Sequence, residues 1–130
     1  MLILRIIGVV YIILGVWCSL LPDQTSQSVG FELINGSGMS EYITVYGGLE
    51  VGLGLAMLIT SFVARLRLGG LAFTFILSAC LPLFRVPTIL VFDVQSTTYA
   101  LMAVEIAFAI LLGLALWREL RKCNTKSQQL

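Results

Sequence analysis

The sequence predicts an all-α fold, an integral membrane antiparallel four-helix bundle with both termini in the cytoplasm. Three observations lead to this prediction: the composition, four long apolar segments, and the distribution of charge around them. Hydrophobic residues make up 58% of the 130 residues and charged residues 12%, whereas soluble domains are about 45–50% apolar and about 25% charged. The mean hydropathy is +0.99. Because so small a chain cannot hide this much apolar surface in a water-soluble core, we expect a bilayer as its solvent.

Four apolar segments are long enough to cross a bilayer, since about 20 helical residues span its hydrocarbon core. The expected spans are residues 2–21, 41–64, 68–85 and 98–117. The first span ends before Pro22 and carries Trp17 where an interfacial aromatic residue belongs. A small-x-small cleavage pattern does not follow it, so we interpret it as a retained helix rather than a signal peptide.

The connections complete a single domain. Residues 23–40 are polar and contain no basic residue, so we expect a polar outer loop there. The short basic link at 65–67 makes the second and third spans antiparallel neighbours. The apolar run 88–92 is too short to span, and it either extends the third helix past a proline kink or lies in the interface. Residues 118–130 are the expected cytoplasmic tail.

Charge is distributed unequally between the two sides of these spans. The side with both termini and the 65–67 link holds Arg5, Arg65, Arg67, Arg118, Arg121, Lys122 and Lys126. The opposite side holds Asp23, Glu32, Glu41 and Asp93, with Arg85 as its basic residue. Because cytoplasmic loops are rich in Lys and Arg, this pattern places both termini inside the cell. We therefore expect a multi-pass protein of the cell membrane, most simply the bacterial inner membrane.

Two acidic residues lie inside the expected spans, Glu50 in the second and Glu105 in the fourth. A charge in the bilayer costs from about 2.5 to more than about 10 kcal/mol, so each carboxyl group has to be protonated, paired or in contact with water. Arg85, at the outer end of the third span, is the expected partner, and Tyr46 lies one helical turn before Glu50. Two interpretations of these four residues stay open. They form either an outward-opening polar pocket, for a ligand or for protons, or a clasp that only fixes helix packing.

Small residues in the second span are candidate helix-packing positions. Gly48, Gly52 and Ala56 recur at steps of four, and such a stripe lets another helix approach closely, within the monomer or in a homodimer. Gly47 and Gly54 flank the span's glutamate and leave space around its carboxyl group.

Several classes of function lack support in the sequence. Histidine is absent, which removes the commonest metal ligand and the commonest general base near neutral pH. The three cysteines do not have metal-binding spacing. We therefore expect no metal, no cofactor, no nucleic-acid partner and no catalytic residue. The expected partners are the lipid bilayer and, as alternatives, a membrane protein, a second copy of the chain or a small hydrophobic ligand.

One segment gives a family resemblance. YGGLEVGLGL (46–55), followed by Arg85, an Asp-containing loop and Glu105, resembles an uncharacterised family of four-helix bacterial membrane proteins, catalogued as a domain of unknown function and similar in layout to DoxX-like proteins. The resemblance implies that Tyr46, Gly47, Gly48, Arg85 and Glu105 are family positions. Members often carry a basic residue shortly before the tyrosine, and here residues 43–45 are Ile, Thr and Val. The resemblance implies a fold and a membrane, and no reaction.

The function expected from these observations is that of a small non-catalytic membrane protein. It is either an accessory or scaffold subunit, or a binder of a small hydrophobic ligand. The alternatives are a proton-coupled transporter or a membrane enzyme that uses Glu50 and Glu105. Against the transporter stands the lack of an evident inverted repeat, and nothing in the sequence specifies a substrate for an enzyme.

Overall fold

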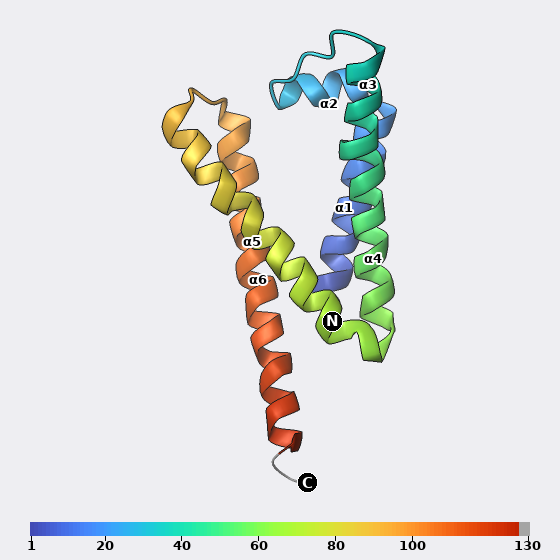
Figure 1. Ribbon diagram of the computed structural model, residues 1–130, viewed down its shortest axis with the longest axis vertical. Helices are drawn as coiled ribbons and strands as arrows, with labels where there is room; N and C mark the ends of the chain where they lie inside the picture. Colours follow the sequence, from blue (N-terminus) through green and yellow to red (C-terminus); the bar gives the residue numbers. More distant parts are fainter. Residues whose placement is uncertain (128–130) are drawn as a thin grey trace.

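The computed structural model describes the backbone of residues 1–127 and the side chains of residues 1–122 (Figure 1). Every regular element in this part of the chain is helical. In chain order the elements are α1 (Leu2–Leu20), α2 (Pro22–Ser28), α3 (Gly36–Tyr42), the π-helical η1 (Ile43–Leu49), α4 (Glu50–Phe62), the 3₁₀ turn η2 (Ala64–Leu66), α5 (Arg67–Val91) and α6 (Ser96–Ser127). Four helical stretches are long and apolar enough to cross a membrane: Leu2–Leu20, Gly36–Phe62, Ala64–Val91 and Ser96–Lys122. The predicted all-α fold with four membrane-spanning helices is confirmed.

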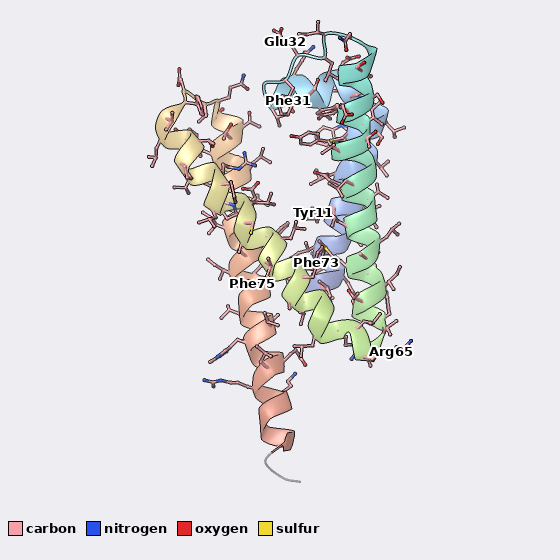
Figure 2. All side chains as sticks on the ribbon, in the orientation of Figure 1. Tyr11, Phe31, Glu32, Arg65, Phe73 and Phe75 are labelled. Atoms are coloured by element: carbon pink, nitrogen blue, oxygen red, sulfur yellow. The ribbon has the colours of Figure 1, made fainter. Side chains whose placement is uncertain are left out.

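The four long helices form two antiparallel hairpins, α1 with η1–α4, and α5 with α6. Figure 1 shows the hairpins close together near the N-terminus of α1 and separated at their opposite ends. We call the end with the N-terminus, η2 and the C-terminal part of α6 the basic end. The basic residues of these segments with described side chains are Arg5, Arg65, Arg67, Arg118, Arg121 and Lys122. The acidic end carries α2, α3 and the α5–α6 connection. Arg65 and Glu32 mark the two ends in Figure 2.

Glycine residues bring α1 and the η1–α4 helix into backbone contact. A Cβ atom added at Gly54 would lie 2.5 Å from the carbonyl oxygen of Gly8, and one at Gly15 would lie 2.7 Å from the carbonyl oxygen of Gly47. Gly8 and Gly15 are seven residues apart on α1, and Gly47 and Gly54 are seven residues apart on the η1–α4 helix. Seven residues make about two helical turns, so the two glycines of each helix lie on one face. Without side chains at these positions the two backbones can approach closely, as small residues allow in membrane helices.

The predicted packing stripe lies on a different face from these contacts. An added Cβ atom at Gly48 or Gly52 meets nothing within 4 Å among the described residues, and Ala56 is exposed. Packing inside the monomer, one of the two alternatives for these three residues, is therefore not seen among the described residues. The reason is rotation about the helix axis, since each residue turns the chain by about 100°. The face that meets α1 is the one with Gly47 and Gly54.

The fully buried apolar core lies in the half of the molecule nearer the basic end. It consists of Leu4, Ile7, Met57, Leu71 and Leu112, so that every long helix contributes. Their packing stabilises the meeting of the two hairpins through van der Waals contacts, because lipid tails are as apolar as these side chains and give no hydrophobic driving force between membrane helices. The hairpins are consequently held together at one end of the bundle.

The connections contain more helix than the sequence predicted. The polar segment 23–40 includes α2, which has Pro22 at its first turn, and α3, which begins at an N-cap. The side chain of Asn35 accepts a hydrogen bond from the backbone N–H of Gly38 at 3.0 Å, as N-cap residues do. The third long helix continues beyond 85 through Pro87 to Val91, which is the first of the two alternatives given for the run 88–92. In the predicted tail, α6 continues to Ser127, and residues 128–130 lie outside the described residues.

Candidate functional site

Arg85 of α5 and Glu105 of α6 form a two-point ion pair. The Arg85 Nε donates to Glu105 Oε2 at 2.8 Å, and Nη2 donates to Oε1 at 2.5 Å. The side chains are 27% and 12% exposed, respectively. Parallel N–H···O bonds of this kind are stronger and more directional than a single contact. The pair belongs to one hairpin, so it fixes α5 against α6.

Glu50 is the first residue of α4, directly after the π-helical segment. Its side chain is half-buried, and its Oε2 atom is buried without a hydrogen-bond partner among the described residues. Helical spacing suggested that Tyr46 could donate to this carboxyl group, but such a bond is not present in the described part of the chain. The π-helix explains the difference, because its i→i+5 bonding widens the turn and changes which side chains stand above one another.

Aromatic side chains cluster at the acidic end of the first hairpin. The rings of Tyr42 and Tyr46 are stacked, with centroids 4.8 Å apart, and the ring of Phe31 lies 5.7 Å from that of Tyr46. The Tyr42 hydroxyl donates to Cys18 Sγ at 3.7 Å, which ties α3 to α1. Sequence reasoning missed Phe31 and Tyr42, although the four-residue spacing of the two tyrosines indicated that they share a helix face.

Two tyrosines on the same hairpin as Glu50 lie close to charged residues of both hairpins. Tyr46 of η1 is close enough to sense the charges of both Glu50 and Arg85. Tyr11 of α1 senses the charges of both Glu50 and Glu105. These five residues are called the polar cluster below. The structure thus brings Arg85 into contact with Glu105, and leaves Glu50 on the other hairpin without a direct bond to either.

Ser78 of α5 is a second buried polar group without a partner. Its side chain is 1% exposed, and its Oγ atom is unpaired among the described residues. It lies seven residues before Arg85, on the same helix face. Pro82, four residues after Ser78, has no N–H to give to the Ser78 carbonyl group. Sequence reasoning did not single out Ser78, because an isolated serine in an apolar helix carries no pattern.

The chemistry available to the polar cluster is hydrogen bonding and charge pairing. Within the described residues, no group of three or more His, Cys, Asp or Glu side chains could hold a metal ion. Glu50 can accept a hydrogen bond from an incoming donor or pair with a cation. The ion pair already uses both oxygens of Glu105, so Glu50 is the carboxyl group that is ready for another partner.

Comparison with known proteins gives one match. The model of a family described as "Domain of unknown function (DUF4345)" matches residues 1–116. Neither a curated protein nor a solved structure matches the chain. The match agrees with the resemblance to an uncharacterised family, while the similarity to DoxX-like proteins stays a prediction.

Proposed function

The chain belongs to the DUF4345 family, a family of unknown function, and from its own geometry we propose that it is a small non-catalytic membrane protein that binds a hydrophobic ligand between its two hairpins. The observation that carries the proposal is the buried, unpartnered Oε2 atom of Glu50. A buried polar atom without a partner costs about 1–3 kcal/mol. A ligand that donates a hydrogen bond to this oxygen recovers that free energy, and this gives the ligand its binding site.

The surroundings of Glu50 support a ligand that is apolar apart from one polar group. The buried core joins the hairpins near the basic end. Arg85 belongs to the part of α5 that leads to the α5–α6 connection, and Tyr46 belongs to η1, directly after α3; Figure 1 shows the hairpins diverging toward that end. Phe31, which is 44% exposed, and the half-buried Tyr46 add flat apolar surface at the acidic end, and the buried Tyr42 ring is stacked against Tyr46. Ligand sites of this kind are mostly apolar, with few polar groups that fix orientation. The ligand enters from the bilayer, with a hydroxyl or amine group directed to Glu50.

The proposed orientation follows from charge. Basic residues in three separate segments lie at the end that carries both termini, and cytoplasmic segments are rich in such residues. With both termini in the cytoplasm, the acidic end and the polar cluster face outward. The cell membrane, in a bacterium the inner membrane, is the location that we propose.

The test is to identify what copurifies with the protein. The protein is isolated from its native membrane in mild detergent, and bound small molecules are extracted and quantified by mass spectrometry. The variant Glu50→Gln removes the acceptor charge, and Glu41→Gln removes a carboxylate from an exposed position on α3 as the matched control.

We expect a stoichiometric ligand in the wild type and in Glu41→Gln. Because a hydrogen bond to a charged group contributes about 1.5–3 kcal/mol, Glu50→Gln should lower the bound amount at limiting ligand by about 10-fold or more. Equal ligand content in Glu50→Gln, or none in the wild type, contradicts the proposal. A stoichiometric protein in place of the ligand favours the accessory or scaffold role.

A proton-coupled carrier is the second candidate, and the π-helical segment before Glu50 is the observation that favours it. π-Helical turns inside α-helices occur often at functional sites, and an ionisable group at such a turn inside a membrane span is a candidate proton carrier. Proton uptake into vesicles that contain the purified protein tests this directly. Uptake that disappears in Glu50→Gln and persists in Glu41→Gln supports the carrier over the binder.

A further inference from the structure

A cavity of about 290 Å³ lies at the basic end, in the opposite half of the molecule from the polar cluster. Three helices contribute to its lining. Leu2 and Ile3 come from the start of α1, Leu71 from α5, and Arg118, Glu119 and Lys122 from α6. The proposed function gives this cavity no role.

The charged part of the lining is positive on balance. Lys122 Nζ lies 2.8 Å from Glu119 Oε1, and the two side chains are 68% and 32% exposed, respectively. Arg118 is exposed and also lines the cavity. Arg67, at the start of α5, is close enough to Glu119 for their charges to interact. Lys122, Arg67 and the N-terminal amine of Met1 are therefore all close to Glu119, and Arg118 lines the same cavity. One carboxylate neutralises only one of these cations.

The apolar part of the lining connects the cavity with the lipid-facing surface. Leu71 is fully buried, whereas Leu2 is 71% exposed. The cavity thus has a charged wall from α6 and an apolar wall that continues outward along α1. A molecule with an anionic head and apolar chains matches both walls, whereas a free anion uses only the first.

Neighbouring residues place the cavity at the level of lipid headgroups. Trp117 is 50% exposed, and the guanidinium carbon of Arg121 lies 3.6 Å from the centre of a Trp117 ring. Tryptophan is enriched at the membrane–water interface. Both residues belong to the same turns of α6 as Arg118 and Lys122.

We propose that this cavity binds the headgroup of an anionic phospholipid. The phosphate group contacts Arg118 and Lys122, Arg67 adds to the positive potential, and the acyl chains run along α1 past Leu2. Arginine suits this task because its planar guanidinium group can bind two phosphate oxygens at once. Basic pockets between membrane helices are typical sites for such headgroups.

The experiment titrates the purified full-length protein in detergent with phosphatidylglycerol or phosphatidylcholine, and counts bound lipids by native mass spectrometry. We expect tighter binding of phosphatidylglycerol. Each of Arg118→Gln and Lys122→Gln should weaken it about tenfold, since each removes a charge-assisted hydrogen bond to the phosphate group inside the cavity. Arg121→Gln, which removes the same charge outside the cavity, should leave binding unchanged.

A variant that is expected to increase lipid binding, rather than to weaken it, makes the test independent of folding defects. Glu119→Gln removes the carboxylate of the cavity and should tighten phosphatidylglycerol binding, a gain that a misfolded protein would not give. Equal affinity for the two lipids, an equal loss in Arg121→Gln, or weaker binding in Glu119→Gln overturns the proposal. Inorganic phosphate, added as a competitor at the lipid's concentration, distinguishes the source of the anion. If phosphate displaces the lipid fully, the cavity is a free-anion site and the lipid proposal is wrong.

Discussion

The ion pair of Arg85 and Glu105 allows a prediction with a definite magnitude. The variants Arg85→Met and Glu105→Leu each remove one partner and leave the other charged in a partly buried position. With only 12% of the Glu105 side chain exposed, solvent cannot replace the lost partner. Leaving one member of a buried ion pair alone costs about 3–5 kcal/mol. We therefore expect each single variant to be less stable than the wild type by about that amount.

The double variant decides whether the two residues act as a pair. It removes both charges and leaves apolar side chains of similar length, which is often close to neutral. We expect the double variant to be more stable than either single variant. The sum of the destabilisations of the two single variants then exceeds the destabilisation of the double variant. The coupling free energy, which is this difference, should be larger than about 3 kcal/mol.

The assay is reversible unfolding in mixed micelles, with helicity followed by circular dichroism while the denaturing detergent is increased. The control is the same cycle on Glu119 and Lys122, a pair with a similar 2.8 Å contact but a far more exposed position. Exposed pairs contribute about 0–1 kcal/mol, so this cycle should show little coupling. Additive costs for the Arg85 and Glu105 variants, or equal coupling in both cycles, would refute the reasoning.

Two further predictions test the packing and the orientation. Gly54→Ala places a Cβ atom 2.5 Å from the carbonyl oxygen of Gly8 and should destabilise the protein by about 1–3 kcal/mol. Gly52→Ala meets open space and should be neutral or stabilising by up to about 1 kcal/mol in the same unfolding assay; equal effects would contradict the assigned face. In a protein freed of its native cysteines, a membrane-impermeant maleimide should label Ser37→Cys on intact cells. It should label Arg65→Cys only after permeabilisation, and the reverse pattern would invert the proposed orientation.

The helices could be predicted from the sequence because their cause is local. Long apolar segments in a chain with few charges predict spans wherever they occur, and four such helices are present. The contact of Arg85 with Glu105 was also within reach, because a basic and an acidic residue in the same membrane half need each other. Both inferences use composition and position along a span, and neither needs to know how the helices are arranged around the bundle.

The face of each helix that meets a neighbour could not be predicted in the same way. Gly47 and Gly48 are adjacent in sequence and equally small, yet only Gly47 meets α1. Which of the two glycines meets α1 depends on α1 itself. Its Gly8 and Gly15 are seven residues apart, as Gly47 and Gly54 are, so these four residues can lie opposite one another. The π-helical segment is a second such case. Its wider turn changes the relation between Tyr46 and Glu50, and periodicity alone gives no sign of it.

Glu105 and Glu50, the two acidic residues inside the membrane spans, differ in their hydrogen-bond partners. We infer from this difference which of the two carboxyl groups binds another molecule. Glu105 has its partner within its own hairpin, so its environment does not depend on how the two hairpins sit relative to each other. Glu50 lies on the other hairpin, with one carboxyl oxygen buried and unpaired among the described residues. The proposed ligand, or a proton in the carrier alternative, is what we expect to meet that oxygen. Arg85 and Glu105 thus form a clasp within one hairpin, whereas Glu50 is not part of it and has one oxygen left for another partner.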